Sequence, residues 1–226
     1  MLDMLDVSTE LRAAYPEASI GILALENVTN SDADPRLNDR KLALETELRK
    51  RFNGMARSDL QQTEPLRSYV TYYKRFRKTY HVLLQLESIV SGGRDIPRAN
   101  CLVEAMFMAE LKNQILTAGH DSTTLSLPLS ATVAAGDEEF VTIGGRSQVL
   151  TAGDMYVEDR EGILSAVLHG PDARTKIGIQ TTGVLYVVYA PPGVDRVAVA
   201  AHLEDIHENV LIFSPFARVS ALEVLP

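Results

Sequence analysis

The chain has 226 residues and a formal net charge of −8, and 46% of its residues are hydrophobic. This composition is typical of a globular protein and excludes a disordered or fibrous chain. No segment approaches the ~18 consecutive apolar residues of a membrane span. The acidic first residues lack the basic and apolar regions of a signal peptide. We therefore expect a cytoplasmic protein without a membrane partner.

The single cysteine, Cys101, lies in an apolar run. One cysteine excludes an internal disulfide and a cysteine-based zinc site, and its setting predicts a buried, inert thiol. The sequence contains no P-loop, Rossmann, HExxH or GxSxG motif. His202 and His207 stand about 140° apart on a helix, so they do not form a zinc pair, and we expect both in solvent. We accordingly expect no metal and no cofactor.

The N-terminal part of the chain predicts helices around one strand. Ser8 places a capping hydroxyl before an acidic first turn, so a short helix begins there and ends at Pro16. Residues 18–26, with the sequence ASIGILALE, are typical of a buried strand. Pro35 then opens a helix that reaches Gly54.

Two further helices are predicted over residues 66–78 and 81–90. In the first of them the apolar and aromatic residues form one compact stripe, with basic residues beside it. Between Arg49 and His81 nine basic residues stand against two acidic ones, so this stretch carries +7 and the remainder −15. It is either a face that binds anions or a solvated helix face. The candidate RNA contacts are Arg67, Lys74, Arg75 and Lys78.

The second half of the chain has helix and strand patterns that are segregated from each other. The helix predicted over Cys101 to Leu116 is apolar almost all round, so we expect it to be buried. After Leu125 short β runs alternate with turn residues, and residues 194–210 predict a closing helix. This order favours an α+β fold in which the buried helix packs on mixed or antiparallel strands.

Three segments of the chain match the pattern of a known domain. Residues 91–121 contain a glycine pair, a proline shortly before Asn100, a Leu-Val-acid start of a buried helix and a Gly-His-Asp loop. In residues 143–164 a glycine turn precedes a Gly-Asp pair and a strand. In residues 170–190 a second glycine-containing turn precedes an apolar strand. Together they resemble the B3/B4 domain of the phenylalanyl-tRNA synthetase beta subunit, above all its free-standing form.

The resemblance implies one B3/B4-like domain over residues 1–226, with a helical and strand part at 1–90 and a motif-bearing core at 91–215. In the synthetase this domain hydrolyses tyrosine wrongly attached to tRNA. The resemblance therefore implies a stand-alone RNA-binding module whose partner is tRNA or aminoacyl-tRNA, and it leaves a deacylase activity open. It does not extend to the catalytic domain that charges tRNA.

Hydrolysis of an ester needs a positioned water and usually a base. The catalytic candidates are two pairs of residues on predicted loops, His120 with Asp121 and His169 with Asp172. If the two loops converge, these side chains would hold a water or a ligand amine. Otherwise they are surface histidines and turn-capping aspartates.

The pocket for the amino acid would combine His120 and Asp121 with the ligand-binding candidates Asn100, Glu104 and Thr175. Glu104 is an acid in a nearly apolar helix, and a buried carboxylate is costly without a partner. It therefore either pairs with Arg98 or Asn100 or lines the pocket.

Several pocket positions that are polar in the family carry Phe107, Ala118 or Gly183 in this chain. Two other functions therefore stay open beside RNA binding. One is a non-catalytic module that binds a small ligand or a protein on the same fold. The other is a metal-free hydrolase that acts on some other ester or amide.

Overall fold

A computed structural model describes residues 4–226 and has the expected α+β architecture. The helices are α1 (Thr9–Ala14), α2 (Pro35–Arg51), α3 (Arg57–Leu60), α4 (Leu66–Arg75), α5 (His81–Val90), α6 (Cys101–Asn113), the short 3₁₀ helix η1 (Ser122–Thr124) and α7 (Arg196–Phe213). The strands are β1 (Leu5–Val7), β2 (Ser19–Glu26), β3 (Thr117–Asp121), β4 (Leu129–Val133), β5 (Glu139–Val141), β6 (Ser147–Val149), β7 (Met155–Asp159), β8 (Gly162–Ala166), β9 (Gly170–Pro171), β10 (Gly183–Ala190) and β11 (Arg218–Leu225). Within residues 4–226, no helix combines the length and the apolar character that a membrane span requires.

Four strands in the order β11-β2-β10-β3 form an antiparallel sheet at the centre of the molecule. Every residue of β10 is buried, and so is every residue of β2 except the last. A strand that is covered on both faces needs apolar residues at consecutive positions rather than at alternate ones. The runs SIGILALE and GVLYVVYA meet that need, which is why these two strands lie in the interior.

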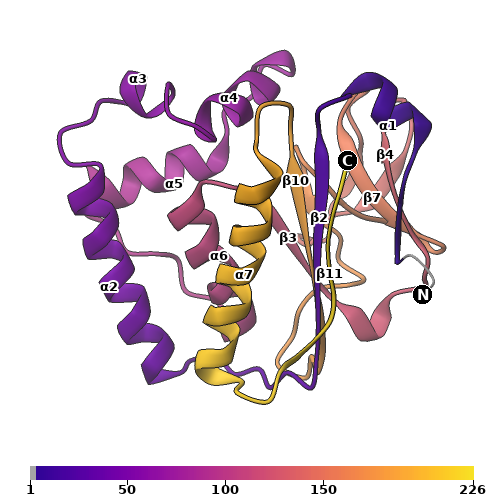
Figure 1. Ribbon diagram of the computed structural model, residues 1–226. Helices are drawn as coiled ribbons and strands as arrows, with labels where there is room; N and C mark the ends of the chain where they lie inside the picture. The colour runs from indigo at the N-terminus through magenta and orange to yellow at the C-terminus, as the bar shows by residue number, and fades with distance from the viewer. Residues whose placement is uncertain (1–3) are drawn as a thin grey trace.

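Helices α6 and α7 cover one face of this sheet, and α2 lies outside them (Figure 1). Helix α6 is buried along most of its length, which confirms the expected central helix. Tyr186 of β10 ties it to the sheet, since its hydroxyl donates to the carbonyl oxygen of Leu102 at 2.8 Å. Helix α7 crosses β2 at Gly21, where a Cβ would come within 2.7 Å of Val199 Cγ1. The glycine therefore lets helix and strand approach closely.

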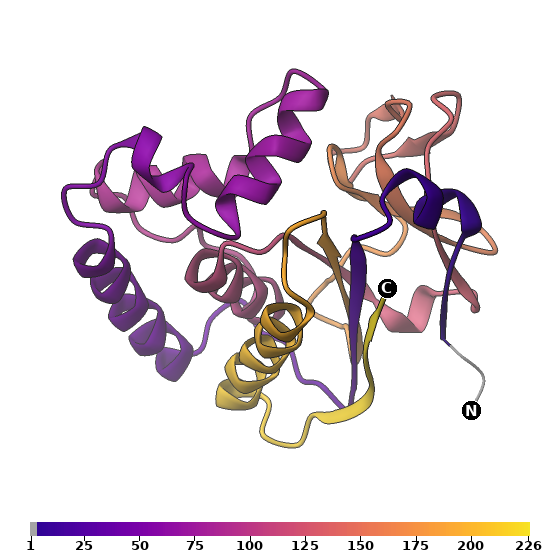
Figure 2. The same ribbon diagram turned by 45° about the horizontal axis from the view of Figure 1, so that its top comes forward.

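A second sheet, in the order β1-β4-β7-β8-β9, lies on the side of the central sheet away from α6 and α7 (Figures 1 and 2). Within it β1 and β4 pair in parallel, and the remaining neighbours pair antiparallel. Strands β5 and β6 form a separate antiparallel hairpin. This mixture of antiparallel and parallel pairing confirms the predicted fold class.

Residues 114–121 differ from the prediction. Helix α6 ends at Asn113, three residues before the predicted Leu116, because Gln114 adopts a left-handed conformation with φ 56°. Strand β3 then pairs with β10, so His120 and Asp121 lie on a strand, and their placement on a loop was wrong. The reason is tertiary, since β10 offers backbone hydrogen-bonding groups that the local sequence does not reveal.

Candidate ligand-binding site

A cavity of about 430 Å³ lies between α6, strand β3 and the turn that joins β8 to β9. His81, the first residue of α5, and Ile143 in the β5–β6 turn line it, and both are exposed, so they mark its mouth. Its walls are mainly apolar and include Val103, Met106, Phe107, Leu116, Val167 and Ile177. A largely apolar hollow with a few polar groups is the usual setting for a small ligand.

Polar side chains occupy both the mouth and the inner wall of this cavity. Asn100 caps α6, since its Oδ1 accepts from the backbone N–H of Val103 at 3.2 Å, and its side chain lines the cavity. Lys176 is exposed at the mouth, as His81 is. Among the residues that the structure describes, Glu110 is the one carboxylate that lines the cavity. The site is therefore apolar with an acid inside and basic groups at its rim.

Glu110 lies on the inner wall, with 2% of its surface exposed. Its Oε1 accepts from the backbone N–H of Thr117 at 2.7 Å. Burial raises the pKa of Glu110 to about 8, because a carboxylate is poorly solvated in apolar surroundings. Sequence reasoning missed this residue, although an acid inside an apolar helix is the same signal that singled out Glu104.

The structure brings His120, Asp172 and Thr175 together, but none of the three lines the cavity. Thr175 Oγ1 donates to Asp172 Oδ1 and lies 2.7 Å from His120 Nδ1. A carboxylate only accepts, so the Thr175 hydroxyl accepts in turn from the Nδ1–H of His120. His120 Nε2 then accepts from Ser165 Oγ at 3.0 Å, and Ser165 Oγ lies 2.7 Å from the Tyr189 hydroxyl.

Every member of this hydrogen-bond chain is at least nine-tenths buried, and His120 has no exposed surface. Burial lowers the pKa of His120 to about 3, so its imidazole is neutral. Both ring nitrogens are bonded inside the protein, which leaves no nitrogen to accept a proton from a water in the cavity. In this structure the series of hydrogen bonds links β3 to β8, to β10 and to the turn before Thr175.

The other two catalytic candidates lie apart from each other. Asp121 Oδ1 accepts from the backbone N–H of Thr123 at 3.0 Å, and its Oδ2 accepts from Thr181 Oγ1 at 2.6 Å. His169 Nε2 lies 3.4 Å from Thr151 Oγ1. Asp121 therefore caps the short helix η1, and neither predicted pair, His120 with Asp121 or His169 with Asp172, shares a contact of its own.

Glu104 has a structural partner that the sequence did not indicate. Its Oε1 lies 2.8 Å from the ammonium of Lys41 on α2, and it also accepts from the backbone N–H of Ala99 at 3.1 Å. The pairing with Arg98 or Asn100 was wrong, because α2 packs directly against α6 and supplies the cation. Glu104 does not line the cavity.

Three tyrosines fix α4 beside the cavity. The hydroxyl of Tyr69 donates to the carbonyl oxygen of Tyr189 at 2.7 Å, and that of Tyr72 donates to Asp154 Oδ1 at 2.8 Å. The Tyr73 hydroxyl donates to the carbonyl oxygen of Val167, a cavity residue, at 2.7 Å. The C-terminal end of α4 is therefore held at the rim of the cavity.

The four candidate RNA contacts on α4 and just beyond it have different surroundings. Arg67 pairs with Glu64 at 2.6 Å, and the guanidinium of Arg75 stacks over Tyr15 at 4.9 Å. Lys74 and Lys78 are exposed and form no ion pair within residues 4–226. Lys78 precedes the cavity residue His81 by three positions, so the Cα atoms of the two residues lie at most about 11 Å apart.

The expectation that His202 lies in solvent was wrong. Its side chain has no exposed surface, its Nε2 lies 2.6 Å from Thr117 Oγ1, and its Nδ1 accepts from Asn113 Nδ2 at 3.2 Å. Burial lowers the pKa of His202 to about 3, so this imidazole is neutral as well. It supports the start of β3 from behind the cavity.

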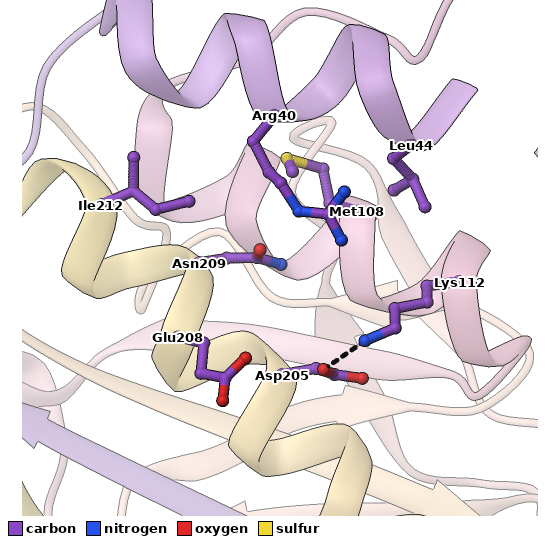
Figure 3. A pocket seen from close by; sticks show the side chains of 8 residues that line it. All are labelled: Arg40, Leu44, Met108, Lys112, Asp205, Glu208, Asn209 and Ile212. Atoms are coloured by element: carbon purple, nitrogen blue, oxygen red, sulfur yellow. Dashed lines mark hydrogen bonds and ion pairs between the residues drawn. The ribbon is translucent and has the colours of Figure 1, made fainter. Parts of the chain in front are cut away.

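A smaller cavity of about 230 Å³ lies between α2, α6 and α7. Figure 3 shows that its charged groups include Arg40, Lys112 and Asp205, and that the ammonium of Lys112 points to the carboxylate of Asp205. These two groups form an ion pair at 2.5 Å, and Arg40 pairs with Glu47 at 3.2 Å. Lys112 and Asp205 thus satisfy each other, and Arg40 is paired with a residue outside this cavity. The larger, mainly apolar cavity is the better candidate for a ligand site.

Comparison with known proteins gives a likeness of fold and no family. No protein-family model matches the chain, and no curated protein matches it. Among solved structures it is similar to an N-terminal fragment of the phenylalanyl-tRNA synthetase beta subunit from Pyrococcus horikoshii, with 12% sequence identity and a TM-score of 0.48. The match covers 96% of this chain and 54% of that one, so the chain spans about half the length of that fragment. The similarity is weak and concerns the overall fold.

Proposed function

We propose that the protein is an RNA-binding module that receives the aminoacylated end of a tRNA. The observation that carries the proposal is a largely apolar cavity with His81 at its mouth, at the end of the basic stretch that holds the exposed Lys74 and Lys78. The lysines would contact phosphates, and the cavity would take the attached amino acid. The motif pattern over residues 91–190 supports the same function.

The charge distribution fits this role. The chain as a whole is acidic, with a formal net charge of −8, so it repels nucleic acid over most of its surface. The +7 stretch between Arg49 and His81 is the exception, and it ends at His81, which lines the mouth of the cavity. RNA would therefore approach from that side.

The proposal is one of binding. A hydrolase needs a base within hydrogen-bond reach of its water. The base expected from the sequence, the imidazole of His120, is enclosed in the protein, and Asp172 accepts from Thr175. A small-ligand module without an RNA partner is the second candidate, because the apolar walls suit an organic molecule by themselves.

Gel-shift titrations with charged and uncharged tRNA test the proposal. We expect charged tRNA to bind more tightly, and the affinity to fall with rising salt because each neutralised phosphate releases counterions. The double variant Lys74→Glu/Lys78→Glu should weaken binding by about tenfold or more, with a smaller salt slope.

The matched control is Arg94→Glu/Arg196→Glu, which makes the same charge change at two exposed residues outside the basic stretch and outside the cavity lining. The control should lose only the small part of the affinity that comes from net charge. Equal losses in the two double variants, or no binding of either tRNA, would contradict the RNA role and leave the small-ligand module.

A further inference from the structure

The carboxyl group of Glu110 is only partly satisfied by the protein. One oxygen, Oε1, accepts from the backbone N–H of Thr117 at 2.7 Å. Within residues 4–226 the second oxygen accepts no hydrogen bond, and the carboxyl group forms no ion pair. The residue lines the cavity, and only 2% of its surface is exposed. The free oxygen is therefore available to a molecule inside the cavity.

The other buried acid of the same helix shows what Glu110 lacks. Glu104 has the ammonium of Lys41 at 2.8 Å and a backbone N–H besides. A buried carboxylate without a cation is strongly unfavourable, and a partner of opposite charge offsets much of that cost. The basic residues that line the cavity, Lys176 and His81, are exposed at its mouth, and neither forms an ion pair with Glu110.

We propose that the cavity binds a primary ammonium group carried on an apolar body, with the carboxylate of Glu110 as its counter-ion. The apolar body would pack against Val103, Phe107 and Ile177, and the ammonium would donate to the free oxygen of Glu110. This inference rests on the proposed function where it identifies the group as the α-ammonium of an amino acid attached to tRNA. The ammonium site itself stands on the cavity and on Glu110 alone.

Binding of a cation should release a proton from Glu110. Burial raises the pKa of this carboxyl to about 8, so it is largely protonated near pH 7, and a bound ammonium favours the carboxylate form. The other titratable groups around it are the cavity residues Lys176, His81 and Tyr189 and, behind it, the phenols of Tyr69, Tyr73 and Tyr80.

None of these neighbours supplies the proton near pH 7. Burial raises the pKa values of all four tyrosines and lowers that of His81, so these groups stay neutral. Lys176 is exposed at the mouth, whereas Glu110 lies on the inner wall. The proton release is therefore assigned to Glu110.

Calorimetric titration of the full chain with 2-phenylethylamine at pH 7 tests the inference. This amine is a fully charged probe, because the pKa of an alkylammonium lies near the ~10.4 of lysine. Measured in two buffers of different ionisation enthalpy, binding should release about one proton per amine. The uncharged probe 2-phenylethanol should bind at least about tenfold more weakly, and without proton release.

The variant Glu110→Gln keeps an acceptor for the Thr117 N–H and removes the charge. It should weaken binding of the amine by about tenfold or more and abolish the proton release, while leaving the binding of 2-phenylethanol unchanged. Glu208→Gln, which changes an exposed acid outside this cavity, should bind both probes like the original protein.

Equal binding of the amine and the alcohol, or amine binding without proton release, would overturn the inference. Both measurements use the unmodified chain, so they test the inference even if Glu110→Gln fails to fold. The outcome of the tRNA titrations does not depend on the outcome of the amine titrations. Amine binding through Glu110 together with no tRNA binding would refute the proposed function and keep the ammonium site.

Discussion

Glu104 and Glu110 stand on the same apolar helix, and the protein treats their charges differently. Glu104 forms a buried ion pair with Lys41, whose ammonium comes from α2. Such a pair adds little net stability, but removing one partner leaves an uncompensated charge in the interior. Glu110 faces the cavity and has a single backbone donor. The first acid therefore serves packing, and the second is free for a ligand.

At this residue scale we predict that Lys41→Met lowers the free energy of unfolding by about 3–5 kcal/mol, because it strands the Glu104 carboxylate. The double variant Lys41→Met/Glu104→Gln should recover most of that loss. Urea unfolding measures both. The neighbouring change Arg40→Met removes a partly exposed pair with Glu47 and should cost less than about 1 kcal/mol. A double variant no more stable than Lys41→Met would refute the ion-pair account.

At the scale of elements, close packing between β2 and α7 depends on one small residue. Gly21 lies in the middle of β2, and a Cβ at this position would come within 2.7 Å of Val199 Cγ1 and 3.2 Å of Leu203 Cδ1. Both contact residues belong to α7, which is fully buried at these positions. The helix can accommodate a methyl group only if its side chains move away from the sheet.

We therefore expect Gly21→Ala to lower the free energy of unfolding by about 1–3 kcal/mol, the usual cost of overpacking a core. The control is Gly178→Ala, since a Cβ at Gly178 meets nothing within 4 Å. That change should be close to neutral in the same urea titration. Equal stabilities of the two variants would show that the β2–α7 contact has room to spare.

At the scale of the whole molecule, buried titratable groups make the stability depend on pH. Glu110 has a pKa of about 8 in the folded protein, whereas a glutamate in an unfolded chain has a pKa of about 4.3. Between these two values the folded state keeps a proton that the unfolded state has lost. The contribution of Glu110 to stability is therefore present at low pH and is lost as the pH rises toward 8.

From this linkage we predict that the original protein loses stability relative to Glu110→Gln as the pH is raised from about 5 to about 8, by at most about 1.4 kcal/mol per pH unit. Urea unfolding at several pH values gives the difference between the two proteins. Glu208→Gln serves again as the control and should follow the original protein at every pH. A difference that does not change with pH would place the Glu110 carboxyl in contact with solvent.

Much of the architecture can be predicted from the sequence, because segments that are buried on all sides need apolar residues at consecutive positions. The uninterrupted apolar runs of β2 and β10 can only lie where both faces of a strand are covered. The nearly all-apolar circumference of α6 likewise requires a central helix. The end of α6 is different, because the start of β3 depends on pairing with β10, a strand that lies far along the chain.

The sequence by itself determined the buried strands β2 and β10, the central helix α6 and the basic stretch, since these depend on each side chain and its near neighbours. It did not determine the burial of His202 or of Glu110. The tertiary structure alone decided the partners of the buried polar side chains. His120 meets Thr175, and Glu104 meets Lys41, across distances in sequence that no local pattern reports. The packing of the elements decides which side chains become partners, and it also creates the cavity that Glu110 faces. Side-chain partners and cavity alike form only when distant segments fold against one another.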